Sequence, residues 1–275
     1  MEVTKRRYFI FELKRSLTSL PSLIFYAYII LMITFNLIER ITDPIGGSST
    51  ALTDLYNFIS SNDAIIQLIY VLPPVVVSLY YFNYDFFRGV EFNLTYHFGI
   101  KYNESFSIKL FAYIITLILP AIAFTYFSNV ILNGNYLVVP LVREMLLFNL
   151  LFTFTSVIFF IIISIIISIY IKANMAAIGA LLNIIIYGAL PFILLSIAIR
   201  NFHNLILLKY LVILFPFVVY DYLNAYEFYV EIYHVSFFES KFFSLIPYFI
   251  GNIILVILLY FLFFTISRKI EVIRR

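Results

Sequence analysis

The residues that could do chemistry in this chain are few, and their spacings match no familiar catalytic or metal-binding motif. There is no cysteine, and the only histidines, His97, His203 and His234, lack the spacing of metal ligands. No phosphate-binding G-x-x-x-x-G-K-[ST] loop, H-E-x-x-H zinc motif or G-x-S-x-G turn occurs. The sequence therefore predicts a chain that is not an enzyme, needs no cofactor and does not itself hydrolyse ATP.

The densest group of polar residues lies between two charge-free stretches, and its members are Asp85, Arg88, Glu91, His97, Lys101, Asn103, Glu104 and Lys109. Phe86, Phe87 and Phe92 lie among them, and apolar rings on a water-exposed segment need a cover, either a partner or the bilayer. A second acidic group, in residues 221–239, is interspersed with aromatic rings and has no basic partner. That composition argues against an enzyme acting on lipids.

The elements that hold these residues are long apolar runs. Only 12% of the 275 residues are charged, and the mean hydropathy is +1.01. A helix needs roughly 20 apolar residues to cross the hydrocarbon core of a membrane. Six stretches long enough to do so carry no Asp, Glu, Lys or Arg: Ser16–Ile38, Ala64–Tyr84, Leu110–Val142, Met145–Ile171, Ala173–Ile199 and Phe242–Ser267.

These runs predict an all-α, polytopic membrane protein, because they lack the alternation of barrel strands and a membrane span must satisfy its own backbone hydrogen bonds. We expect residues 1–275 to form a single transmembrane domain. Its six spans are expected at about 21–38, 64–82, 110–131, 145–169, 175–197 and 246–266. The very short turn at Lys172–Asn174 predicts that the fourth and fifth spans form an antiparallel hairpin.

Residues 5–19 precede the first span and predict an interfacial amphipathic helix. Phe9, Leu13, Leu17 and Leu20 recur at helical spacing and are expected to form its apolar face. The basic residues Arg6, Arg7, Lys14 and Arg15 are expected to meet lipid phosphates at the inner surface. The alternative is a simple positively charged anchor with no further role.

The distribution of basic residues predicts that both termini are cytoplasmic. With the N-terminus inside, the inner segments hold 13 of the 18 Lys and Arg residues, as expected for cytoplasmic loops of a cell-membrane protein. An even number of spans returns the C-terminus to the same side. Between the fifth and sixth spans, Tyr210–Tyr220 is apolar but too short to cross, which predicts a re-entrant or interfacial segment.

The layout resembles the membrane subunit, or permease, of ABC transporters of the ABC-2 type. Asp85, Arg88, Gly89 and Glu91 resemble the acidic and glycine-containing start of that family's inner loop, and Lys109 resembles the lysine that opens its third span. Gly99 stands where the family has proline, and Ile108 where it has glycine. Leu214–Phe217 resembles the outer Leu-Ser-Pro-Phe without its serine.

The resemblance implies an exporter subunit that forms a translocation path and is driven by a separate ATPase subunit. It implies a second permease copy or a related chain as partner, with membrane lipid around both and no nucleic acid. It also implies that the inner loop docks on the ATPase through Asp85, Phe87, Arg88, Gly89, Glu91 and Phe92.

No ionisable residue is expected at mid-depth of a span, which argues against proton coupling. The alternative is a structural or assembly subunit of a larger membrane complex, without transport of its own.

Overall fold

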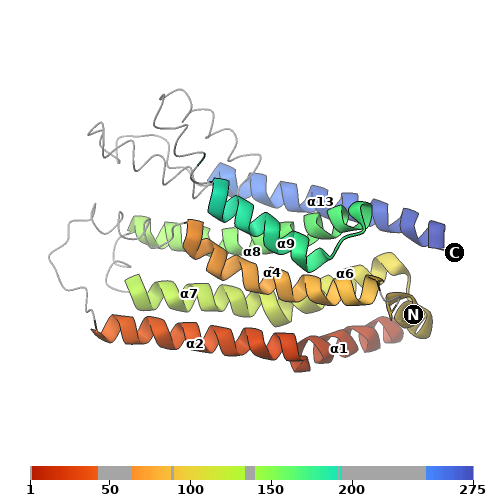
Figure 1. Ribbon diagram of the computed structural model, residues 1–275, viewed down its shortest axis with the longest axis horizontal. Helices are drawn as coiled ribbons and strands as arrows, with labels where there is room; N and C mark the ends of the chain where they lie inside the picture. Colours follow the sequence, from red (N-terminus) through yellow and green to blue (C-terminus); the bar gives the residue numbers. More distant parts are fainter. Residues whose placement is uncertain are drawn as a thin grey trace.

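A computed structural model describes residues 2–42, 64–87, 90–133, 140–190, 193 and 246–274. These residues form long helices that run roughly side by side (Figure 1), and none of them lies in a strand. The start of α1 (Glu2–Thr18) and the end of α13 (Ile246–Arg274) lie at the same end of the bundle (Figure 1). We call this the terminal end.

The helices coincide with the apolar runs of the sequence, and the all-α prediction is confirmed for the described residues. The runs correspond in order to α2 (Leu20–Thr42), α4 (Ala64–Phe87), α6–η1–α7 (Tyr102–Tyr113, Ile114–Ile118, Leu119–Asn133), α8 (Pro140–Ile171), α9–η3 (Met175–Ile184, Ile185–Ala189) and α13. The short helix α5 (Val90–Phe98) lies between α4 and α6. The predicted segment at 210–220 and the acidic group at 221–239 lie outside the described residues.

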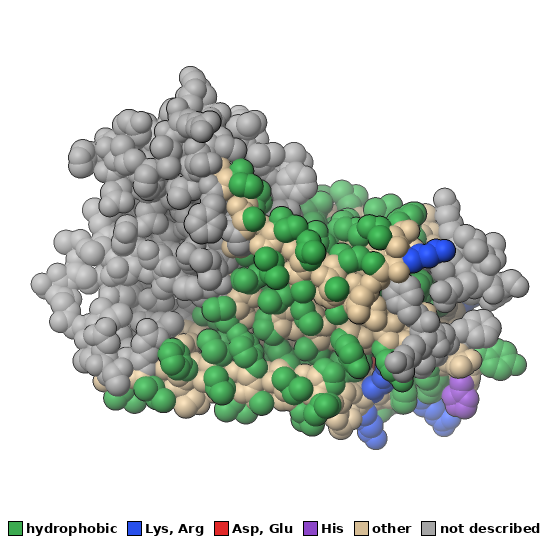
Figure 2. Space-filling model, in the orientation of Figure 1, with side chains coloured by type: hydrophobic (Ala, Val, Ile, Leu, Met, Phe, Trp, Pro, Cys, Tyr) green, Lys and Arg blue, Asp and Glu red, His purple; other side chains and the backbone are tan. Residues whose placement is uncertain are grey.

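Three of the described helical stretches are long and apolar enough to cross a membrane: Leu20–Ile38, Tyr102–Ser128 and Thr153–Ile171. Two shorter apolar stretches are Met175–Tyr187 and Ile253–Ile266. Large apolar side chains cover much of the described surface in Figure 2, and those of α2 include Ile30, Leu31 and Phe35, each at least 60% exposed. A surface of this kind is compatible with contact to lipid.

The N-terminal helix α1 forms as predicted, but a different face of it is buried. The inward stripe is Tyr8, Glu12 and Ser16, each fully buried, whereas Leu17 is 42% exposed. This stripe has the same four-residue spacing as the expected apolar one but is offset by one position. The Tyr8 hydroxyl pairs with Ser105 and the Glu12 carboxylate lies 4.0 Å from the Lys109 ammonium group, both on α6, while the Ser16 hydroxyl donates to the Leu13 carbonyl of α1 itself. Arg6, Arg7 and Lys14 remain exposed on the outer side of α1.

Two tyrosines of α2 compensate for prolines in the neighbouring helices. Proline lacks the N–H that would bond the carbonyl four residues earlier, so Pro73 leaves the Ile69 carbonyl without its usual helical donor. The hydroxyl of Tyr28 donates to that carbonyl at 3.1 Å. In the same way the hydroxyl of Tyr26 donates to the carbonyl of Thr116, four residues before Pro120 and within the π-helical turn η1. The helix α4 continues through Pro73 and Pro74.

We predict that Tyr28→Phe lowers the free energy of unfolding by about 1 kcal/mol, the lower end of the cost of leaving a carbonyl unpaired, because this carbonyl is only partly buried. In a Pro73→Ala background, the backbone N–H restored at position 73 can donate to the Ile69 carbonyl. Tyr28→Phe should then lower the free energy of unfolding much less. Thermal unfolding of the detergent-solubilised parent, of the two single variants and of the double variant tests whether Tyr28 serves the Ile69 carbonyl. Equal costs in both backgrounds would show that the hydroxyl does not serve the proline-freed carbonyl.

The predicted hairpin of α8 and α9 is confirmed. Lys172 adopts a positive φ of 57° in the turn, and the Asn174 side chain caps α9 by accepting from the N–H groups of Ala176 and Ala177. The amide oxygen of Asn83 on α4 accepts from the N–H of Met175 at 2.9 Å. The start of α9 is therefore fixed both by its own turn and by α4, against which α9 also packs.

Candidate functional site: a buried ionic cluster

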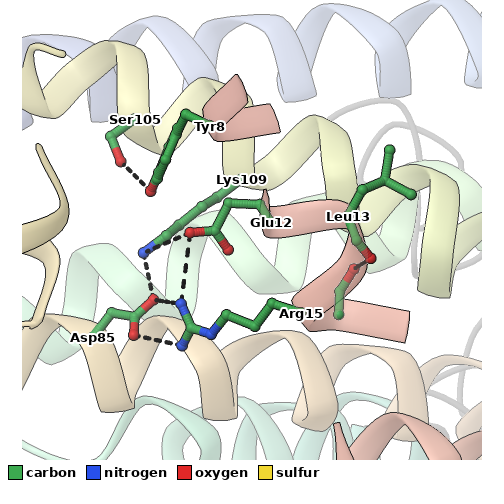
Figure 3. A network of polar contacts seen from close by, with 8 residues as sticks. Tyr8, Glu12, Leu13, Arg15, Asp85, Ser105 and Lys109 are labelled. Carbon is green, nitrogen blue, oxygen red and sulfur yellow. Dashed lines mark hydrogen bonds and ion pairs between the residues drawn. The ribbon is translucent and has the colours of Figure 1, made fainter. Parts of the chain in front are cut away.

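Four charged side chains from three helices meet inside the bundle near the terminal end (Figure 3). Glu12 and Arg15 come from α1, Asp85 from the last turn of α4, and Lys109 from α6. The side chains of Glu12, Asp85 and Lys109 are at most 1% exposed. We refer to these four residues as the ionic cluster.

Asp85 is the centre of the cluster. Both of its carboxylate oxygens accept from the Arg15 guanidinium, at 2.8 and 2.6 Å, in the two-point geometry that suits arginine and carboxylate. The ammonium group of Lys109 donates to the same carboxylate. The guanidinium carbon of Arg15 also lies 5.6 Å from the centre of the Tyr81 ring, a contact favourable to a cation. One carboxylate therefore holds α1 and α6 against α4.

Glu12 completes the charge balance. Its carboxylate lies 3.6 Å from the Arg15 guanidinium and 4.0 Å from the Lys109 ammonium group. With all four groups ionised, the two carboxylates and two cations sum to zero, which is the condition under which buried charges are tolerated. Burial raises the pKa of Glu12 above its ordinary value, and Lys109 and Arg15 oppose that rise. The folded chain therefore retains a proton on Glu12 more readily than the unfolded chain does.

Two further polar contacts extend the connection between α1 and α6. The Tyr8 hydroxyl and the Ser105 hydroxyl are 2.7 Å apart and buried, and the Lys5 ammonium group donates to Glu104 at 2.9 Å. The residues of α1 that face α6 thus include the polar side chains of Lys5, Tyr8 and Glu12 beside the Phe9 ring, whose centre lies 5.8 Å from that of Phe111. An amphipathic helix normally buries apolar residues, so this arrangement gives α1 a specific register rather than a general affinity for the core.

The connection between α4 and α6 ends in a tight turn beside the cluster. Gly99 has a φ of 63°, a conformation that favours glycine, and follows the last residue of α5. The N–H of Gly99 bonds the carbonyl of Tyr96 at 3.2 Å, and the N–H of Ile100 bonds that of Thr95 at 2.9 Å. These two bonds complete a helix stop, and α6 begins at Tyr102. Gly99 is also the residue that stands where the family that the sequence resembles has proline.

The cluster has the properties of a mechanical connection rather than of a reaction centre. Its cations and carboxylates pair with one another, and three of its four side chains are closed to solvent. It joins Arg15 to Asp85, which are 70 positions apart in the chain, and Asp85 to Lys109, which are 24 positions apart. The cluster therefore bonds the last turn of α4 to both α1 and α6.

The structure brings together two of the site residues expected from the sequence. Asp85, expected to face a partner, is buried, and Arg15, expected to face lipid phosphates, points inward to Asp85 because a buried carboxylate requires a cation (Figure 3). Phe87 ends α4, and Glu91 and Phe92 belong to α5, with their side chains outside the description. Arg88 and Gly89 lie outside the described residues.

Lys109 and Glu12 were not expected in a buried site. Lys109 was expected to open the third span, but the helix begins at Tyr102, so Lys109 lies within it. Glu12 is the only acidic residue in the basic stretch 5–19, and it shares a four-residue spacing with Tyr8 and Ser16. That isolated acid on a polar helical stripe is the signal in the sequence that could have predicted an inward-facing charge.

Comparison of the whole chain with protein-family models, with curated proteins and with solved structures finds no match.

Proposed function

We propose that the chain is the membrane subunit of an ABC transporter of the ABC-2 type, which spans the cell membrane six times and is driven by a separate ATPase subunit. The observation that carries the proposal is the ionic cluster. It pairs Asp85 and Lys109, two residues on which the loop resemblance rests, and adds Arg15 from the N-terminal helix. The three segments that mark this family in the sequence are thus in contact.

The arrangement of the helices supports six crossings with both termini cytoplasmic. Six helical runs correspond to the six expected spans, and the first and last described residues lie at the terminal end (Figure 1). Exposed cations gather at this end in Figure 2, and Arg6, Arg7, Lys14, Lys101 and Lys172 are exposed. Lys and Arg are concentrated on the cytoplasmic side of membrane proteins. The terminal end is therefore the cytoplasmic end in this proposal.

The cluster suggests how movement of a cytoplasmic motor reaches the spans. An ATPase subunit that grips α5 displaces the start of the α5–α6 connection and the last turn of α4. Because Asp85 is bonded to both Arg15 and Lys109, the displacement passes to α1 and α6 rather than being lost in a flexible loop. In this mechanism substrate is exported along a path between two such subunits, and ATP is hydrolysed only by the partner.

The test is purification of the tagged chain in mild detergent from the cells that make it. We expect a protein with a G-x-x-x-x-G-K-[ST] loop to co-purify and the complex, reconstituted in lipid nanodiscs, to hydrolyse ATP. Glu91→Ala on α5 should abolish co-purification, while Lys101→Ala, an exposed charge in the turn before α6, should retain it. Recovery of other membrane chains without an ATPase would favour a structural or assembly subunit and contradict the proposal.

A further inference from the structure

A groove of about 1150 Å³ opens on the side of the bundle between α1, α6, α8 and α13. Most of its wall is apolar, and three of the residues that border it, Phe111, Ile257 and Phe261, are 57%, 47% and 61% exposed. Ligand pockets for small molecules usually enclose about 300–1000 Å³ and bury most of the ligand. This groove is at least as large and remains open along its side, which suits a long apolar chain better than a compact ligand.

The polar groups of the groove gather at one of its ends. Lys5 and Arg6 of α1 line this end, and the hydroxyls of Ser107 and Tyr260 lie 2.6 Å apart where α6 approaches α13. Lys5 is paired with Glu104, whereas Arg6 is exposed and has no ion pair among the described residues. Along the groove, the positive charge of Arg6 is thus followed by the hydroxyls of Ser107 and Tyr260 and then by an apolar wall.

The groove extends along about two thirds of the depth of one leaflet of a membrane. From Ser107 in α6 to Ile114 at the start of η1, the helix rises about 10 Å, at 1.5 Å per residue. Half of a hydrocarbon core of about 30 Å is about 15 Å. The cationic end lies toward the terminal end of the bundle, because Lys5 and Arg6 are near the start of α1 (Figure 1). The groove therefore follows the direction that a lipid chain takes in a membrane.

We propose that this groove binds an anionic phospholipid, with its phosphate at Arg6, its glycerol and ester region beside Ser107 and Tyr260, and an acyl chain against Phe111, Ile114 and Val256. Charge complementarity selects this occupant: an anionic lipid brings a net negative charge to Arg6, whereas the choline ammonium of a zwitterionic lipid offsets its phosphate, and an apolar helix face of a second copy would bury Arg6 unpaired. The proposal concerns lipid recognition alone and does not depend on a transported substrate or on an ATPase.

The chain contains no tryptophan, so a single Phe111→Trp substitution places one indole on the groove wall. Brominated acyl chains quench tryptophan fluorescence on contact. In vesicles that contain brominated phosphatidylglycerol or brominated phosphatidylcholine, we expect Trp at position 111 to favour phosphatidylglycerol by about fivefold. That ratio corresponds to about 1 kcal/mol, the attraction of one Lys or Arg to anionic lipid.

Two controls separate a specific site from the general lipid layer. Arg6→Gln should abolish the preference, while Arg7→Gln, which removes an exposed cation of the same helix outside the groove, should retain it. A reporter in Phe127→Trp, at a residue of α7 that is 54% exposed and not in the groove, should show no preference. Equal quenching by both lipids at position 111, or loss of the preference in both arginine variants, would overturn the site. Absence of quenching by either lipid would show that another chain covers the groove.

Discussion

Replacing Asp85 by asparagine should lower the free energy of unfolding by about 3–5 kcal/mol, the cost of removing one partner from a buried ion pair. The reason is the charge balance of the ionic cluster. Without the Asp85 carboxylate, Arg15 and Lys109 face a single carboxylate, Glu12, at 3.6 and 4.0 Å. Lys109 is 1% exposed and cannot reach water to recover its solvation. We expect a large fall in the thermal unfolding temperature of the solubilised protein.

A second substitution tests whether the imbalance of charge is the cause. Lys109→Met alone should also be strongly destabilising, since it leaves an excess negative charge. The double variant Asp85→Asn/Lys109→Met restores neutrality with the remaining Glu12 and Arg15, so its cost should be well below the sum of the single costs. Lys14→Met removes an exposed cation of α1, the helix that carries Glu12 and Arg15, and is the control, expected within about 0.5 kcal/mol of the parent. Additive costs in the double variant would contradict a coupled cluster.

The positions of the helices could be predicted because charge-free apolar runs of about 20 residues or more are typical of membrane-spanning helices. Helix α13 begins at the expected residue, Ile246, and α9 begins at Met175 after the expected turn. The helix ends were less predictable, since the expected spans were placed to exclude charged residues. In the structure α4 extends to Phe87 and α6 begins at Tyr102, so both Asp85 and Lys109 are inside helices.

The ionic cluster itself could not be predicted from local patterns. Periodicity along α1 favours burial of Leu13 and Leu17, and nothing within residues 5–19 shows that the partners of Glu12 and Arg15 lie on other helices. The burial of Glu12 and Arg15 depends on Asp85 and Lys109, which are distant in the chain. Only the three-dimensional arrangement reveals that the four charges sum to zero. The hydrogen bonds from Tyr26 and Tyr28 to carbonyls of neighbouring helices likewise join residues that are distant in the chain.

The contact between α9 and α4 leads to the second large expected effect, at Gly179. A Cβ atom at this position would lie 2.2 Å from Cδ1 of Leu79, and 3.3 Å from Oγ of Ser164 and Cγ1 of Val75. Leu79 and Val75 are fully buried, so their side chains cannot move aside without displacing the core. Small residues at helix interfaces allow this close approach in membrane proteins.

We expect Gly179→Leu to lower the free energy of unfolding by more than about 3 kcal/mol, beyond the usual range for overpacking. The reason is that even a Cβ atom has no room at this position. Gly179→Ala should be milder, since alanine gains about 1 kcal/mol of helix propensity that offsets part of the clash. Adding Leu79→Ala to Gly179→Ala removes the clashing methyl group, so the double variant should be more stable than the two single costs predict. Ala177→Leu enlarges an exposed residue of the same helix and should be neutral. Size-exclusion chromatography after heating measures the folded fraction of each variant, and a Gly179→Leu chain as stable as Ala177→Leu would show that α9 does not approach α4 this closely.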